Sequence, residues 1–197
     1  MGSDVLPCYV ACDISLSMAD HIDELNAGLR EFRGAVHASL LDRVLCSVIG
    51  FGAEPVLVQR LLPMDELADL PAPGVSAGTD FGPVFTFLRA SIESDARVLA
   101  AHRLQVHRPL VFFLSDGQPT DPVTWPAALS RLTDPAWESR PRMVTFGVGD
   151  ADGEVLARIG TYRSYLSRDG VRLGTALIAS VMHVLSTSRP PGDRTLS

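Results

Sequence analysis

The sequence predicts an α/β protein: a doubly wound, Rossmann-like three-layer sandwich whose central sheet is mostly parallel with one antiparallel edge strand. Short apolar runs alternate with longer segments in which apolar residues recur every three or four positions. The runs are apolar throughout, which is typical of parallel strands that are buried on both faces. A helical segment separates most of them, as the crossover between two parallel strands requires.

Six segments have the character of strands. The four residues 52–55 separate the second strand from the third, and a link this short predicts an antiparallel hairpin. The third strand should therefore lie at an edge of the sheet. The expected strands are residues 5–13, 44–51, 56–62, 109–115, 142–149 and 164–167.

Five segments have the character of helices. Asp80 and Asp152 stand where a side chain can cap a helix, and Asp121 is followed by a proline at the first helical position. The loop 63–78 is rich in Pro, Ala and Gly, with one helical turn expected at 65–70. The expected helices are residues 19–41, 80–102, 121–132, 152–159 and 171–186.

The 197 residues fit a single domain, expected over residues 1–187, with a polar and disordered tail at 188–197. A chain of this size buries about 70% of its surface on folding, so its core needs no disulfide or structural metal. All 17 basic residues are Arg. The absence of Lys excludes Schiff-base chemistry and a P-loop phosphate lysine.

The net charge of −6 argues against a nucleic acid or an anionic membrane as partner. No apolar run approaches the roughly 18 residues of a membrane-spanning helix, and the first residues lack the pattern of a secretory signal. The three cysteines, Cys8, Cys12 and Cys46, lie in apolar runs. We interpret them as buried reduced thiols and expect a cytoplasmic protein.

Oxygen-bearing side chains follow the first and fourth strands. Asp13, Ser15 and Ser17 come at the end of the first strand, and Asp116 comes at the end of the fourth. Thr79 precedes the second helix. In doubly wound sheets, sites form beyond the carboxyl ends of the strands where the winding reverses. We therefore expect these five side chains to converge there.

Such a set of oxygens suits a hard divalent cation, Mg²⁺ or Mn²⁺. Three hydroxyls are neutral ligands, and the two carboxylates supply charge directly or through waters. A carboxylate from a partner is a natural further ligand. The lack of sulfur and imidazole ligands argues against zinc and copper.

Three motifs carry a resemblance to the von Willebrand factor A family over about residues 5–187. They are D-x-S-x-S-M at 13–18, G-T-D at 78–80 and S-D-G-x-P-T-D at 115–121. The resemblance implies a domain that recognises proteins and is not an enzyme. It also implies a metal-ion-dependent adhesion site that binds Mg²⁺ or Mn²⁺ and accepts Glu or Asp from a partner protein. That site falls on Asp13, Ser15, Ser17, Thr79 and Asp116.

Residues 108–125 are particularly similar to the bacterial tellurium-resistance-associated, TerY-like members of that family. This branch implies an intracellular adaptor or scaffold with kinase- and phosphatase-like neighbours. One position departs from the family pattern: the first motif has Leu16 where the family often has glycine. We expect Leu16, Asp80 and Gln118 at the rim of the metal site.

Other functions compete with this one. Residues 74–78 match the G-x-S-x-G elbow of hydrolases, and Ser76, Asp116 and His183 follow the triad order. However, Pro71 and Pro73 occupy the place of the strand that must precede the elbow. Asp13 could also be the nucleophile of a phosphotransferase, although no lysine balances the phosphate. A metal-independent structural module is the third alternative.

Two smaller patterns have simple interpretations. Residues 150–154 faintly resemble a calcium loop, but the glycine comes too early, so we read a loop with Asp152 as a helix cap. His102, Arg103, His107 and Arg108 form a basic cluster. We interpret this cluster as a solvated helix end, with contact to a phosphate or an acidic partner as the alternative.

Overall fold

The computed structural model describes residues 4–36, 43–74 and 78–187. Its strands form one sheet in the order β3-β2-β1-β5-β6-β7, with the short β4 paired to the start of β1. All pairs are parallel except β2 with β3. The predicted fold class is therefore confirmed. The strands are β1 (Asp4–Asp13), β2 (Val44–Phe51), β3 (Pro55–Pro63), β4 (Gln105–Val106), β5 (Leu110–Ser115), β6 (Arg142–Gly147) and β7 (Arg163–Leu166).

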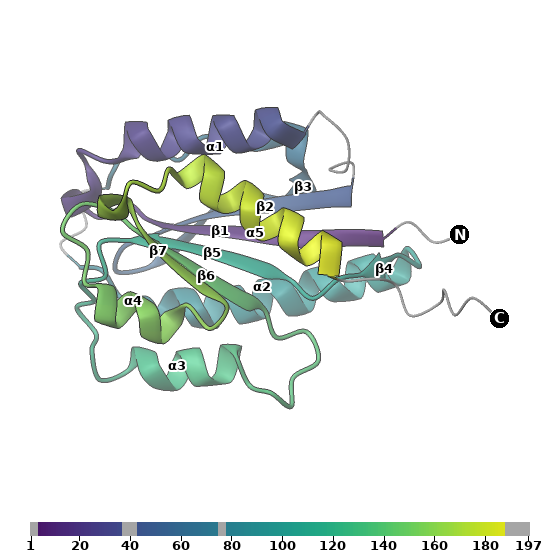
Figure 1. Ribbon diagram of the computed structural model, residues 1–197. Helices are drawn as coiled ribbons and strands as arrows, with labels where there is room; N and C mark the ends of the chain where they lie inside the picture. The colour runs from purple at the N-terminus through teal and green to yellow at the C-terminus, as the bar shows by residue number, and fades with distance from the viewer. Residues whose placement is uncertain (1–3, 37–42, 75–77, 188–197) are drawn as a thin grey trace.

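Helices cover both faces of the sheet (Figure 1). α1 and α5 pack on one face, and α2, α3 and α4 pack on the other. Short 3-10 turns lie at Leu16–Met18, Met64–Glu66 and Ser167–Asp169. The helices are α1 (Ile22–Val36), α2 (Phe81–Ala101), α3 (Trp125–Leu132), α4 (Gly153–Ile159) and α5 (Leu173–Thr187).

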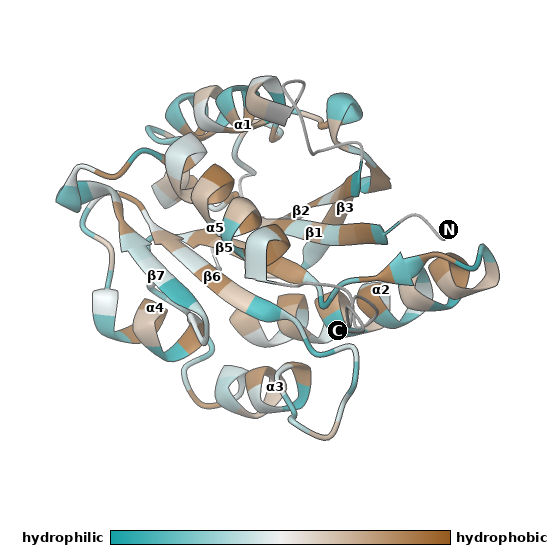
Figure 2. Ribbon diagram, turned by 45° about the vertical axis from the view of Figure 1, so that its right-hand side comes forward, coloured by the Kyte–Doolittle hydropathy of each residue, from teal (hydrophilic) through white to brown (hydrophobic). Residues whose placement is uncertain are grey.

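The apolar runs lie between these two helical layers. Successive side chains of a strand point to opposite faces, so Cys8 and Val10 join the core beneath α1 and α5, while Tyr9 and Ala11 join the core beneath α2 and α3. β1, β2 and β5 are hydrophobic along most of their length (Figure 2). Burial on both faces explains why these strands show no alternation in the sequence.

The hairpin prediction is also confirmed. β3 runs antiparallel to β2 at the edge of the sheet, and Val56 and Leu57 on it are exposed. The three cysteines are buried free thiols, as expected. Within the described ranges, no helix is both long and apolar enough to cross a bilayer.

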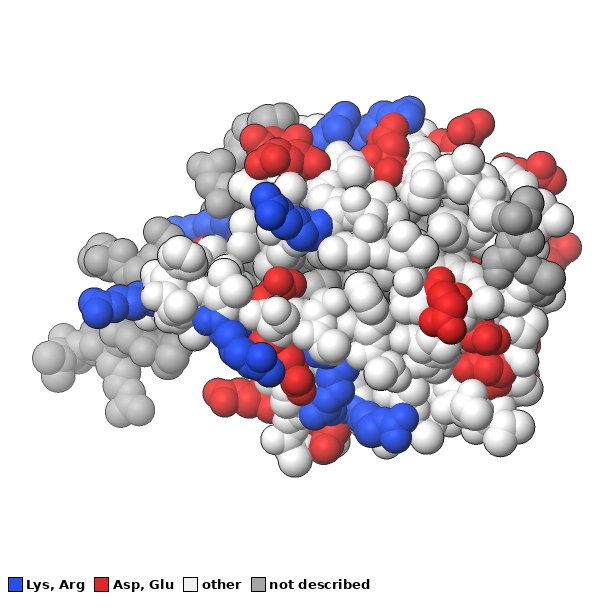
Figure 3. All heavy atoms as spheres, turned by 180° about the vertical axis from the view of Figure 1, so that it is seen from behind, with Lys and Arg blue, Asp and Glu red and all other residues white. Residues whose placement is uncertain are grey.

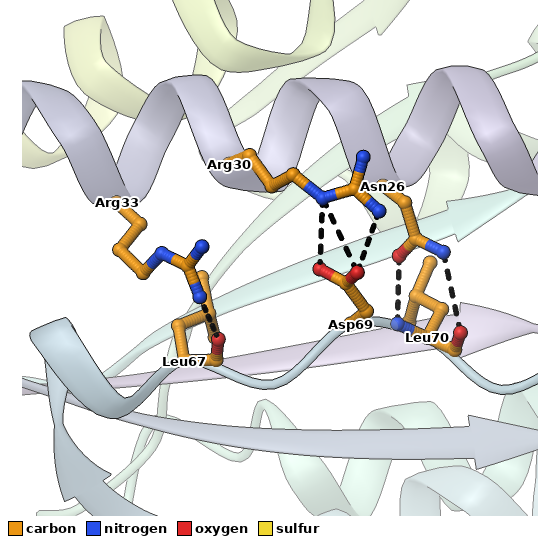
Figure 4. Close-up of polar contacts among 6 residues, drawn as sticks. All are labelled: Asn26, Arg30, Arg33, Leu67, Asp69 and Leu70. Atoms are coloured by element: carbon orange, nitrogen blue, oxygen red, sulfur yellow. Dashed lines mark hydrogen bonds and ion pairs between the residues drawn. The ribbon is translucent and has the colours of Figure 1, made fainter.

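The connection from β3 to α2 is held against α1 (Figure 4). The Asn26 side chain accepts from the backbone N–H of Leu70 at 2.7 Å and donates to its carbonyl at 3.2 Å. Arg30 forms an ion pair with Asp69 at 2.6 Å. Further along, the N–H of Gly74 donates to the carbonyl of residue 14 at 2.8 Å. These contacts hold the segment between β3 and α2 first against α1 and then against the loop that follows β1.

Several element boundaries differ from the predictions. The first helix starts at Ile22 because a 3-10 turn precedes it, and its expected end falls in residues 37–42, outside the described residues. The helical turn expected at 65–70 is a 3-10 turn at Met64–Glu66. β6 ends at Gly147 rather than 149. β4 was not expected, and two residues are too short to give a periodic signal. The tail at 188–197, expected to be disordered, also lies outside the described residues.

The largest error concerns Asp121, which the sequence assigns as the cap of its own helix. α3 begins only at Trp125, with Thr124 at the capping position. The Asp121 carboxylate instead accepts from the N–H groups of Phe81 and Gly82, both at 2.8 Å. It caps α2 from another loop, whereas the Asp80 side chain makes no capping hydrogen bond there.

Candidate metal site

Two neighbouring strands end where the winding of the sheet reverses. From the central pair β1 and β5, the chain continues outward to β2 on one side and to β6 on the other. Asp13 is the last residue of β1, and Ser115 is the last residue of β5. We call the side on which the parallel strands end the carboxyl side of the sheet, and the opposite side the amino side. The predicted residues lie on the carboxyl side.

Asp13 is fully buried at this point, with 0% of its surface exposed. Its Oδ1 accepts from the backbone N–H of Ser15 at 2.9 Å, and its Oδ2 accepts from the Ser115 hydroxyl at 2.9 Å. The Ser115 oxygen accepts in turn from the N–H of Gly117 at 3.0 Å. Asp13 therefore fixes the two loops relative to each other.

Three further oxygens form a chain from one loop to the other. Ser15 Oγ lies 3.0 Å from Ser17 Oγ, and Ser17 Oγ donates to Oδ2 of Asp116 at 2.8 Å. Adjacent ligands of an octahedral Mg²⁺ with bonds of about 2.0–2.1 Å lie about 2.8–3.0 Å apart. The spacing of these oxygens therefore fits a hard cation of that size.

The backbone of Thr79 is hydrogen-bonded to Thr120 on the loop that follows β5. Its N–H donates to Thr120 Oγ1 at 2.9 Å, and its carbonyl accepts from the N–H of Thr120 at 2.9 Å. Thr120 also donates to Oδ1 of Asp80 at 2.5 Å. The start of α2 is thus joined to the loop after β5. The structure brings four predicted residues into one hydrogen-bonded group and holds Thr79, which is buried, against the loop that carries Asp116.

Gly117 allows the loop after β5 to turn tightly toward α4. Its φ is +75°, and a β-carbon there would lie 2.8 Å from the carbonyl oxygen of Asp152. The N–H of Asp152 donates to the carbonyl of Asp116 at 2.8 Å. The Asp152 side chain caps α4, as expected, so the resemblance of residues 150–154 to a calcium loop reflects a helix start.

The site is acidic. Burial raises the pKa of Asp13, the nearby charge of Asp116 adds to that effect, and the hydrogen bonds from Ser15 and Ser115 oppose it. On the face seen in Figure 3, the end of the molecule on the carboxyl side carries Asp and Glu but no Arg. This charge favours a cation. In the part of the chain that the structure describes, no three His, Cys, Asp or Glu side chains gather, so the hydroxyls are essential to the candidate set.

The rim carries exposed apolar side chains. Leu16 is 68% exposed between Ser15 and Ser17. Gln118 is exposed, and Asp80 is half-buried. Sequence reasoning missed Val123, which is 88% exposed on the loop that follows β5. It also gave no role to Ser115 and Thr120, although both stand inside the third motif.

The alternative catalytic arrangements do not assemble. A nucleophilic Asp13 would have to reach substrate, but it has no exposed surface and both of its oxygens are hydrogen-bonded. The His183 ring lies 6.1 Å from the ring of Tyr162, which directly precedes β7 on the amino side. Asp116 lies on the carboxyl side, so the two cannot share a triad. Ser76 lies outside the described residues.

The fold is similar to that of several solved structures. A von Willebrand factor type A protein from Catenulispora acidiphila matches with a TM-score of 0.67 and 15% identity over 93% of this chain and 43% of that one. The chain has the fold of a von Willebrand factor A domain. No protein-family model and no curated protein matches the sequence.

Two further neighbours have the same fold. The pilus adhesin SpaC from Lactobacillus rhamnosus GG matches with a TM-score of 0.67 and 14% identity over 93% of this chain and 30% of that one. Proximal thread matrix protein 1 from the mussel byssus, solved with a zinc-occupied MIDAS motif, matches with a TM-score of 0.60 and 16% identity over 90% and 46%. The chain spans less than half the length of these three structures.

Proposed function

We propose that this chain is a member of the von Willebrand factor A family that recognises a partner protein through a divalent cation. Mg²⁺ or Mn²⁺ would be held by Asp13, Ser15, Ser17, Thr79 and Asp116. A Glu or Asp of the partner would complete the coordination. The function is recognition and not catalysis.

One observation carries this proposal. Ser17 Oγ lies 3.0 Å from Ser15 Oγ on its own loop and 2.8 Å from Oδ2 of Asp116, which comes from a loop 99 residues away in the sequence. The zinc-occupied MIDAS motif in the mussel protein supports a metal site on this fold.

Four of the five residues have roles that their side chains and hydrogen bonds indicate. Ser15 and Ser17 would bind through neutral hydroxyls, which leave the positive charge of the cation largely uncompensated. Asp13 accepts a hydrogen bond from the Ser115 hydroxyl and orients the Ser15 loop by accepting from the Ser15 N–H. Asp116 would supply negative charge. When bound, the cation supplies the positive charge that attracts a carboxylate.

Leu16 and Val123 would extend the contact beyond the metal. Both are large apolar side chains that stand in water on loops of the carboxyl side. Apolar contacts at the rim would select among partners that all present a carboxylate. We further propose that this protein is an intracellular, TerY-like adaptor whose partner is a kinase- or phosphatase-like protein. The similarity of residues 108–125 to the TerY-like members supports this proposal.

Calorimetry of chelator-stripped protein tests the metal site. One Mg²⁺ or Mn²⁺ should bind per chain. Asp116→Asn should weaken binding on the order of tenfold to hundredfold. Asp65→Asn, which removes an exposed carboxyl on the amino side, is the control and should bind as the wild type does. Equal affinity in the Asp116 variant would contradict the proposal.

A pull-down tests recognition. A partner protein should be retained in Mg²⁺ and released in chelator. Leu16→Gly should reduce retention while leaving metal affinity within about threefold, because Leu16 offers the cation no side-chain ligand. Retention that survives the chelator would favour the metal-independent module.

A further inference from the structure

A second charged feature lies on the amino side of the sheet. Arginines lie at or just before the starts of three neighbouring parallel strands. Arg108 stands two residues before β5, Arg142 is the first residue of β6, and Arg163 is the first residue of β7. Leu110 pairs with Arg142, and Val144 with Arg163. Because parallel strands begin on the same side, these arginines gather on the side opposite the candidate metal site.

A small pocket opens between these strand starts. It has a volume of about 190 Å³ and is lined by Arg108, Thr133, Arg142, Thr161 and Tyr162. The terminal nitrogen Nη1 of Arg142 is buried and has no hydrogen-bond acceptor among the described residues. A guanidinium nitrogen that is buried without an acceptor is costly, and an anion bound beside Arg142 in the pocket would offset the charge of this guanidinium.

Arg108 and its neighbour Arg140 donate to neutral acceptors. Arg108 donates to the carbonyl oxygens of Arg140 and Pro141, which are neutral acceptors. Arg140 donates to the carbonyls of Pro135 and Trp137. Among the described residues, no Asp or Glu forms an ion pair with Arg108, Arg140 or Arg142.

The pKa of Arg108 reflects its surroundings. Burial lowers it, and the charges of Arg140 and Arg142 lower it further. A bound anion would relieve both effects, because it offsets the repulsion and pairs the partly buried guanidinium.

The other lining groups complement the arginines. The Thr161 oxygen accepts from the N–H of Met143 at 3.4 Å, and its O–H has no acceptor among the described residues, so it can serve as a donor to a ligand. The Thr133 hydroxyl already donates to the carbonyl of Leu129 and is not available. The Tyr162 ring lies 5.8 Å from the Arg142 guanidinium and 5.7 Å from that of Arg163. This contact orients both cations.

We propose that this pocket binds a small oxyanion of the phosphate class, held by Arg108 and Arg142 with Thr161 as a further donor. Planar guanidinium groups match the oxygens of phosphate in a forked geometry. The volume is below the roughly 300–1,000 Å³ of pockets for larger ligands, which favours a single phosphate or sulfate group over a nucleotide. The proposal does not depend on the metal site.

Thermal unfolding in inorganic phosphate tests this inference. The full chain is titrated with phosphate in excess chelator, with sodium chloride adjusted to constant ionic strength, so that neither a bound cation nor screening contributes. The midpoint should rise and saturate, as expected for a ligand that binds the folded state. Sulfate should compete with phosphate in ³¹P NMR titrations. A midpoint that responds to ionic strength alone would overturn the proposal.

Arg142→Met tests the location of the anion. Phosphate affinity should fall about tenfold or more. Without phosphate this variant should be at least as stable as the wild type, because it loses an unpaired buried nitrogen, so weaker binding will not reflect unfolding. Arg60→Met removes the same charge from an exposed position on β3 and should bind phosphate as the wild type does. Equal affinity in the Arg142 variant, or an equal loss in the Arg60 variant, would overturn the proposal.

Discussion

The Ser115 hydroxyl donates a hydrogen bond of 2.9 Å to Oδ2 of Asp13. These residues end the two neighbouring strands β5 and β1, and both are fully buried. The bond joins the two halves of the doubly wound sheet at the point where they diverge. It also holds in place the carboxylate that positions the Ser15 loop.

Ser115→Ala should therefore destabilise the fold. A hydrogen bond to a charged group contributes about 1.5–3 kcal/mol, and its loss leaves one Asp13 oxygen without a donor. Urea unfolding measures this difference. Ser180→Ala is the control, because Ser180 is equally buried but donates only to the carbonyl of Ala176 in its own helix. An effect no larger than that of the control would mean that the Asp13 contact contributes little.

Gly117→Ala should cost roughly 2–5 kcal/mol. The substitution places a β-carbon in the left-handed region and 2.8 Å from the Asp152 carbonyl oxygen. Gly170→Ala separates these two causes, because Gly170 has φ +76° but no atom within 4 Å of the added carbon. That control should cost only about 1–2 kcal/mol. Equal losses of stability in the two variants would show that Gly117 does not pack closely against the Asp152 carbonyl at the start of α4.

Asp121→Ala should cost about 1–2 kcal/mol through the loss of the α2 cap. Asp80→Ala should cost about 1 kcal/mol or less, because the Thr120 hydroxyl is the only donor to the Asp80 side chain among the described residues. Chemical denaturation of the two variants compares them directly. A larger loss of stability in Asp80→Ala than in Asp121→Ala would mean that Asp80 caps α2, which would contradict the structure.

Asp95→Asn should change the pH dependence of stability. Burial raises the pKa of Asp95, and the 2.9 Å hydrogen bond from Tyr9 opposes this only in part. The folded state therefore holds this proton more tightly than the unfolded state, whose pKa is about 3.9. Stability contributed by the protonated group is lost as the pH rises through the raised pKa.

The free energy of unfolding of the wild type relative to the Asp95→Asn variant should therefore decline as the pH rises from about 4 toward neutrality. Unfolding in urea at a series of pH values measures it. Asp65→Asn corrects for the general loss of one negative charge. A difference that rises with pH would mean that folding lowers the pKa of Asp95.

The sequence was sufficient for elements with a local signal. β2 spans the expected residues 44–51, and Asp152 caps α4 as its position suggested. The strand boundaries are clear because burial on both faces requires a continuous apolar run. Convergence of Asp13, Ser15, Ser17 and Asp116 also followed, because parallel strands end on the same side of a sheet.

The errors concern contacts between segments that are distant in sequence. Asp121 and Pro122 have the local pattern of a helix start, yet the carboxylate is used by the amides of Phe81 and Gly82 about 40 residues away. The unpaired Arg142 nitrogen is likewise invisible in the sequence. Whether a buried group has an acceptor depends on the three-dimensional packing and not on its neighbours in the chain.

Crystals soaked in Mn²⁺ and measured at an anomalous wavelength test the central claim most directly. A single strong anomalous peak should lie within bonding distance of Ser15 Oγ, Ser17 Oγ and Thr79 Oγ1, and it should be lost in Asp116→Asn crystals. A map without a peak between the loops that follow β1 and β5, or with the three hydroxyls turned apart, would contradict the account.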